Sequence, residues 1–137
     1  MPKINHILET ALYVNDMARA LALYRDVLGL KVMENGERLS TIDAGRNSVL
    51  LLCTRGKSVA DLPTPGGIIP GHDGAGPVHM AFAIGAGEYQ VWRDHLSENG
   101  VTIRSEVCWE RGGRSLYFND PDGHVLELAT PGLWPNY

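Results

Sequence analysis

The alternation of hydrophobic and polar residues predicts a strand at residues 4–14, and a helical pattern follows it. Glu9, Ala11 and Tyr13 would share one face of this strand. Asn15 or Asp16 can cap the helix, and Gly29 can end it. Its apolar residues recur every three to four positions as one buried stripe, namely Met17, Leu21, Tyr24 and Leu28. Three short strands are predicted next, at 30–34, 39–43 and 49–54.

The second half of the chain repeats this plan. A strand is predicted at 77–84, a helix at about 87–99, and further strands near 101–107, 114–118 and 124–130. Residues 38–54 align with residues 114–130 without a gap, and residues 9–14 align with 79–84. The sequence therefore predicts an α+β fold in which one β-α-β-β-β module is used twice.

The predicted modules occupy residues 4–54 and 77–130 of a single domain that spans 1–137. Residues 55–76 between them carry too much glycine and proline for a regular element. They are interpreted as a linker, which could be a lid over a site or a plain flexible connector. The tail at 131–137 is apolar, and Leu133 and Trp134 are predicted to dock on the protein or on a second subunit.

Composition narrows the class of partner. The chain has 137 residues, 44% hydrophobic and 20% charged, and its net charge is −4, so nucleic acid and anionic membranes are poor partners and a small molecule is favoured. No apolar run approaches the roughly 20 residues of a membrane span, and the first residues lack a signal-peptide core, which indicates a cytoplasmic protein. Cys53 and Cys108 are expected to be buried free thiols rather than a disulfide.

A predicted hairpin at residues 114–130 presents a carboxylate to a buried face. Residues 119–123, Asn-Asp-Pro-Asp-Gly, are turn formers between two β-prone runs. In the second run Glu127 shares its face with the small apolar residues Val125 and Ala129. Burying this charge costs free energy unless it has a partner, and a cation is the usual partner. The alternative is a carboxylate satisfied by Arg114 or by backbone donors.

Glu9, His79 and Glu127 are the polar exceptions on the inner faces of the predicted strands. One imidazole and two carboxylates form a hard ligand set that suits Mn²⁺, Fe²⁺, Ni²⁺ or Co²⁺, and zinc remains possible. Three protein ligands would leave open positions for substrate oxygens, as in catalytic metal sites. His79 could instead be a hydrogen-bonded core histidine and Glu9 a solvent-exposed glutamate. Tyr117 could act as a general acid or be structural.

Three stretches resemble the vicinal oxygen chelate superfamily, which includes glyoxalase I, bleomycin-binding proteins and extradiol dioxygenases. They are residues 9–16 with the helix to Leu30, then Gly76-Pro-Val-His79, and then residues 116–127, Leu-Tyr-Phe-Asn-Asp-Pro-Asp-Gly-His-Val-Leu-Glu. The resemblance implies two modules curved into an open, partly closed barrel, a homodimer, and metal positions at Glu9, His79 and Glu127. A fourth position, used in glyoxalase I, falls on Leu51.

Two departures from the family's patterns shape the functional prediction. Leu51 cannot bind a metal, which weighs against a strict glyoxalase I. The dioxygenase signature requires an upstream histidine where this chain has Cys108-Trp109-Glu110, which weighs against catechol cleavage. The resemblance implies lyase or isomerase chemistry of the glyoxalase kind, with Glu9 or Glu127 moving a proton. The alternatives are an Fe²⁺ dioxygenase and a metal-free protein of the bleomycin-binding type.

Overall fold

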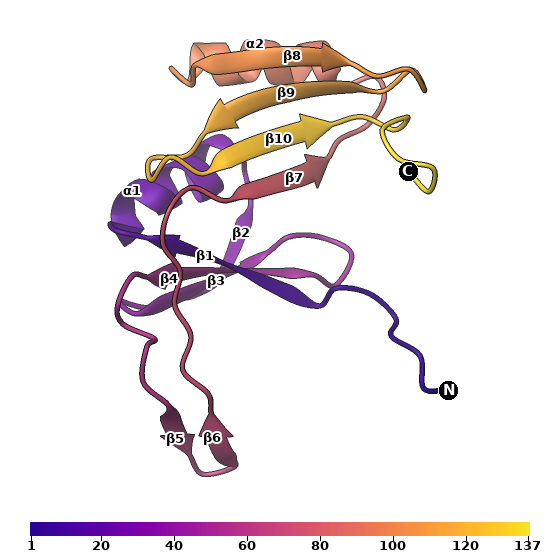
Figure 1. The fold of residues 1–137 in the computed structure, drawn as a ribbon. Coiled ribbons are helices and arrows are strands. Elements are labelled where there is room, and N and C mark those ends of the chain that lie inside the picture. Colours follow the sequence, from indigo (N-terminus) through magenta and orange to yellow (C-terminus); the bar gives the residue numbers. More distant parts are fainter. The chain divides into compact units, whose positions relative to one another are not determined.

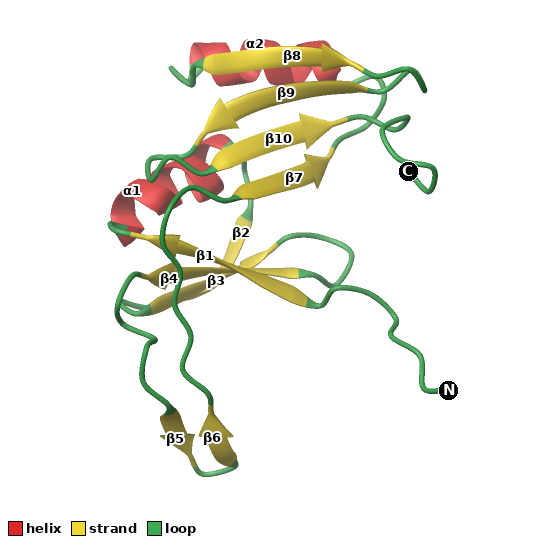
Figure 2. Ribbon diagram, in the orientation of Figure 1, coloured by secondary structure: helices red, strands yellow, loops and turns green.

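Two four-stranded sheets carry the fold, one in a unit formed by residues 1–75 and the other in a unit formed by residues 76–137. The coordinates are a computed structural model that describes all of residues 1–137. Figure 1 follows the chain through its elements, and Figure 2 shows that strands and loops predominate over helices. The α+β class predicted from the sequence is confirmed.

The first unit places its strands in the order β1-β4-β3-β2, with β1 parallel to β4 and the other neighbours antiparallel. The strands are β1 (Glu9–Val14), β2 (Lys31–Asn35), β3 (Leu39–Asp43) and β4 (Val49–Thr54). Helix α1 (Met17–Leu21) continues as the π-helical turn η1 (Ala22–Val27). The Asp16 side chain accepts from the Arg19 amide at 3.1 Å, which confirms it as the cap. β1 begins at Glu9, later than predicted.

The second unit repeats the arrangement in the order β7-β10-β9-β8, with β7 parallel to β10. Its strands are β7 (His79–Ala83), β8 (Ile103–Cys108), β9 (Arg114–Asn119) and β10 (Val125–Ala129). Helix α2 (Tyr89–Glu98) lies between β7 and β8 in the chain. The strand registers also match: Glu9 pairs with Val49 as His79 pairs with Val125. The two sheets therefore share one strand order and one register between their parallel strands.

Each sheet buries one face against its own apolar side chains. Because side chains alternate along a strand, the residues that point to this face recur every second position. The apolar side chains buried in the first unit include those of Leu12, Val14, Tyr24, Ile42, Leu50 and Leu52, and those buried in the second include Leu96, Leu116, Phe118, Leu126 and Leu128. The opposite face of each sheet is then left to carry the candidate functional residues.

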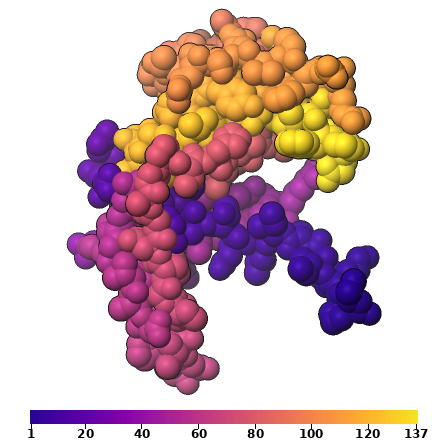
Figure 3. Space-filling model, in the orientation of Figure 1, coloured from indigo at the N-terminus to yellow at the C-terminus, as the bar shows by residue number.

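The linker contains a regular element that the sequence did not predict. Strands β5 (Leu62–Thr64) and β6 (Gly67–Ile69) pair antiparallel across a turn at Pro65 and Gly66. All six strand residues are exposed, and Figures 1 and 3 show the hairpin and the N-terminus extending away from the sheet of the first unit. The glycines and prolines that argued against structure here close and flank a short hairpin instead.

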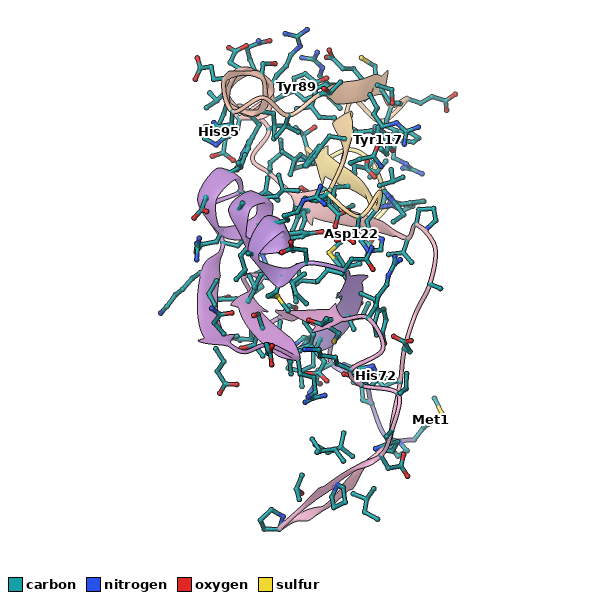
Figure 4. The ribbon with its side chains drawn as sticks, turned by 90° about the vertical axis from the view of Figure 1, so that its left-hand side faces the viewer. Met1, His72, Tyr89, His95, Tyr117 and Asp122 are labelled. Carbon is teal, nitrogen blue, oxygen red and sulfur yellow. The ribbon has the colours of Figure 1, made fainter.

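The returning arm of the linker lies on the first unit. The His72 amide donates to the Ser58 carbonyl at 2.8 Å, and the Tyr13 hydroxyl lies 2.6 Å from His72 Nδ1. Figure 4 labels His72 on this arm. Gly74 is pressed against the Tyr13 ring, where a Cβ atom would come within 2.5 Å of a ring carbon. His72 is exposed, and its contact with Tyr13 ties this arm to β1.

Replacing Tyr13 with phenylalanine should loosen this arm without unfolding the unit. The ring would still pack on Gly74, but the hydrogen bond to His72, worth about 1 kcal/mol, would be lost. The His72 amide should then exchange with solvent about 5-fold faster. Amide exchange followed by NMR measures this, with the Ser48 amide, bonded to Gly45, as an internal control. Unchanged exchange at His72 would show that the phenol does not hold the arm.

On the outer face of the second unit, Tyr89 joins α2 to the sheet. Its hydroxyl donates to Glu106 at 2.6 Å, Arg93 Nε donates to the same carboxylate at 3.0 Å, and the Arg114 guanidinium lies 3.6 Å from the Tyr89 ring centre. Arg114 therefore contacts Tyr89 and is not the partner of Glu127 that the sequence left open. Figure 4 labels Tyr89.

The Tyr89 contact predicts an alkaline limit to stability. Burial, followed by the hydrogen bond to Glu106, raises the pKa of Tyr89 to about 12. Because the folded-state pKa lies above the ordinary value of about 10, this stabilisation should be complete below pH 10 and lost as the pH rises to 12. Urea unfolding from pH 8 to 12 should show a steeper loss for the natural protein than for Tyr89→Phe. Parallel curves for the two proteins would contradict the assignment.

The expectation that both cysteines are buried is corrected. Cys53 is buried as predicted, but Cys108 is exposed because it ends β8, an edge strand. His124, which follows the turn after β9, is buried, and its Nδ1 accepts the Val78 amide at 3.1 Å. Trp134 is 62% exposed within the chain, so its docking on a second subunit stays a prediction, and the Tyr137 hydroxyl donates to the Ala129 carbonyl at 2.9 Å. Neither helix is long and apolar enough to cross a membrane.

Candidate metal centre

Glu127 lies in the middle of β10 and is only 3% exposed. Its neighbours across the sheet are Tyr117 on β9 and Ala81 on β7. The strand puts it on the face opposite Leu126 and Leu128, which are core residues. A carboxylate in this position must have partners for both of its oxygens, because an unpaired buried charge is costly.

His79 supplies a group close to one of these oxygens. Its Nε2 lies 3.2 Å from Glu127 Oε2, and its side chain is 52% exposed. The other ring nitrogen, Nδ1, lies 2.9 Å from the Val125 carbonyl oxygen. A carbonyl can only accept, so Nδ1 must carry the proton in that contact. In a neutral imidazole Nε2 is then an acceptor that faces the carboxylate.

Two acceptors 3.2 Å apart need a positive species between them or beside them. A second proton on His79 would serve, and so would a cation bound by both atoms. Two ligands about 2.1 Å from one ion and at right angles to each other are about 3.0 Å apart, close to the spacing of this pair. The donor set, a buried carboxylate and a tautomer-fixed imidazole, therefore fits half of a divalent metal site.

The second oxygen of Glu127 is held by a chain of donors that sequence reasoning missed. The Ser115 hydroxyl donates to Glu127 Oε1, and Trp109 Nε1 donates to the Ser115 oxygen at 2.8 Å. Ser115 pairs with Ala129 across the two strands, so it shares a sheet face with Glu127. The alternation along residues 114–119 contained the signal that places Ser115 there, but nothing in the pattern pointed to Trp109.

Tyr117 completes the surroundings of the pair. Its ring stacks on His79 with centroids 6.1 Å apart and planes at 28°. Burial, and then the negative charge of Glu127, raise the pKa of the Tyr117 phenol. Figure 4 labels Tyr117 on β9. The phenol stays protonated at neutral pH and is able to donate a hydrogen bond, and its hydroxyl contacts Glu127 and Ser115.

Glu9, the third predicted ligand, belongs to the first unit. It is exposed and begins β1, and its register partner Val49 makes it the counterpart of His79. Ala11 pairs with Leu51 as Ala81 pairs with Glu127, so Leu51 is the counterpart of Glu127. Within neither unit do three or more His, Cys, Asp or Glu side chains gather at metal-binding distance. The structure thus brings together His79, Glu127 and Tyr117 in the second unit.

The sequence of the chain matches the family model of the Glyoxalase/Bleomycin resistance protein/Dioxygenase superfamily over residues 3–128. The chain belongs to this superfamily. Members of the superfamily similar to it include metallothiol transferase FosB of Staphylococcus epidermidis, 31% identical over 131 residues, covering 95% of this chain and 84% of the relative. FosB of Lysinibacillus sphaericus is 31% identical over 132 residues, with 95% and 83% covered.

A solved structure in the same superfamily also resembles this one closely. Lactoylglutathione lyase from Agrobacterium tumefaciens superimposes with a TM-score of 0.88 at 31% identity, covering 98% of this chain and 99% of that chain. The resemblance to the superfamily that the sequence motifs implied is thus confirmed. The matched proteins are named as transferases and as a lyase, so membership of the superfamily does not by itself identify the reaction of this chain.

Proposed function

We propose that this protein is a divalent-metal-dependent enzyme that acts on a small substrate bound through two adjacent oxygens. The observation that carries the proposal is the contact between His79 Nε2 and Glu127 Oε2, two atoms that both accept hydrogen bonds when the imidazole is neutral. His79 and Glu127 would hold the ion, and the proposal keeps Glu9 as the third ligand on the strength of its family position. A bound divalent cation would supply Lewis acidity at the substrate oxygens.

The protein's own groups would bind and orient the substrate and move a proton. Tyr117, stacked on His79 and protonated at neutral pH, would donate to a substrate oxygen. Glu127 is buried, and its Oε1 already accepts from Ser115. Of the two carboxylates that the sequence nominated to move a proton, Glu9 is therefore the better choice, because it is exposed.

The reaction that we propose is a lyase or isomerase step of the lactoylglutathione-lyase kind. The structural similarity to the Agrobacterium tumefaciens protein supports it. Thiol transfer is the second candidate, because the sequence relatives are named metallothiol transferases and because Leu51 removes the fourth ligand position. Both candidate reactions place a sulfur compound near the ion.

The proposal also includes a cytoplasmic location and a homodimeric assembly.

Metal analysis and two assays test the proposal. Protein purified without chelators, or loaded with Mn²⁺, Co²⁺, Ni²⁺, Fe²⁺ or Zn²⁺, should carry about one ion per chain. A lyase would consume the adduct of methylglyoxal and a low-molecular-weight thiol, and a transferase would consume the thiol when a small epoxide is present. Oxygen uptake with a catechol panel would identify a dioxygenase instead. A protein that cannot be loaded with any of these ions would be a metal-free binding protein, and the proposal would fall.

A further inference from the structure

The position of Glu127 depends on a chain of hydrogen bonds whose direction can be settled from chemistry alone. The indole N–H of Trp109 can only donate, so the Ser115 oxygen is the acceptor at 2.8 Å. The single hydroxyl proton of Ser115 is then free to go to Glu127 Oε1. Every donor in this chain points toward the carboxylate, which matches the anionic form that binds a metal.

Burial makes this arrangement stiff. Ser115 is completely covered, and Glu127 is only 3% exposed, so neither side chain has solvent to replace its partner. With Oε1 fixed by Ser115, the remaining oxygen, Oε2, is the one directed to His79 Nε2 at 3.2 Å. The serine thus determines which carboxylate oxygen is available to an ion on the histidine side.

Trp109 is held in the turn between β8 and β9. Its amide donates to the Gly113 carbonyl at 2.8 Å, and the Gly112 amide donates back to the Trp109 carbonyl at 2.9 Å, closing the turn between β8 and β9. Gly113 is packed so closely on Gly132 that a Cβ atom would come within 2.6 Å of the Gly132 carbonyl carbon. The indole therefore reaches Ser115 from a turn that is locked in place.

We infer that Ser115 and Trp109 are positioning residues that hold Glu127 ready for a divalent metal ion, and that the Trp109 indole senses whether the ion is bound. This inference rests on the proposed function. It gives a role to Trp109, which lies in the stretch where the dioxygenase signature requires a histidine. The effect on the ion passes through Glu127, because neither residue needs to touch the ion.

Titration of the full chain with Mn²⁺, followed by calorimetry and by tryptophan fluorescence, tests the inference. Partners that orient a metal ligand typically account for 10–100-fold in metal affinity, so Ser115→Ala should raise the Kd for Mn²⁺ by about this factor. Trp109→Phe should raise it by less. Ser115→Thr, which keeps the hydroxyl, should restore most of the affinity. Mn²⁺ should change the fluorescence of the natural protein, and Trp109→Phe should lose that change.

Trp134→Phe is the matched control, because Trp134 is 62% exposed in the same unit and has no place in the chain of donors. It should retain both the Mn²⁺ affinity and the fluorescence change. Thermal melts without metal separate lost affinity from lost folding, and Trp109→Phe, at an exposed position, is the variant that should fold normally. If the natural protein binds no Mn²⁺, Fe²⁺, Co²⁺, Ni²⁺ or Zn²⁺, the proposed function and this inference both fail. If it binds an ion and both variants bind it equally well, the inference alone is overturned.

Discussion

Glu127→Gln should bind Mn²⁺ more than about 100-fold more weakly than the natural protein, a larger loss than the removal of an orienting partner causes. The substitution preserves the shape of the side chain but takes away the charge that a cation needs. His79→Ala should have an effect of similar size, because it removes the imidazole whose Nε2 lies 3.2 Å from the carboxylate. Calorimetric titration and elemental analysis after dialysis both measure these losses.

The same glutamine should leave the metal-free protein as stable as before, or about 1 kcal/mol more stable. Its amide oxygen can still accept from Ser115, and its amide nitrogen can donate to His79 Nε2, which faces a second acceptor in the natural protein. Chemical unfolding of apo proteins measures this. Glu106→Gln, on the outer face of the same unit, is the control and should bind metal normally. Full metal affinity in Glu127→Gln would refute the assignment of Glu127 as a ligand.

Leu126→Ala should destabilise the protein by about 2–5 kcal/mol, because it leaves a cavity at a position with no exposed surface. Leu50→Ala should cost a similar amount, since Leu50 is its counterpart in the first unit, pairing with Thr10 as Leu126 pairs with Met80. Urea unfolding monitored by circular dichroism gives both values. The control is Ile68→Ala at a 67% exposed position, which should change stability by less than about 0.5 kcal/mol. A loss below 1 kcal/mol at position 126 would contradict the assigned core.

Strand alternation and internal repetition predicted most of the fold. A period of two along residues 124–130 was enough to put Glu127 on one face and Leu126 on the other, and the alignment of residues 9–14 with 79–84 anticipated the register that pairs Glu9 and His79 with equivalent valines. These features depend on local geometry, which a sequence expresses directly. The π-helical turn η1 and the β5–β6 hairpin were missed, because each depends on backbone contacts that no short pattern encodes.

The candidate site was predicted less completely than the fold. His79 and Glu127 stood out because polar groups were unexpected on buried strand faces, and the structure places them 3.2 Å apart. Ser115 was overlooked because a small hydroxyl is ordinary in a strand, and its importance comes only from its partner. Trp109 reaches the site from a turn whose conformation depends on a contact with Gly132, nineteen residues farther along the chain than Gly113. Long-range contacts of this kind leave no periodic signal.

The matched registers of the two sheets also give Glu127 a counterpart in the first unit. That counterpart is Leu51. Its neighbours across the sheet are Ala11 and Thr41, whereas those of Glu127 in the second unit are Ala81 and Tyr117. A substitution at position 51 would leave the residues around Glu127 in the second unit unchanged. Leu51→Glu would therefore place a carboxylate on β4 at the register position that Glu127 has on β10.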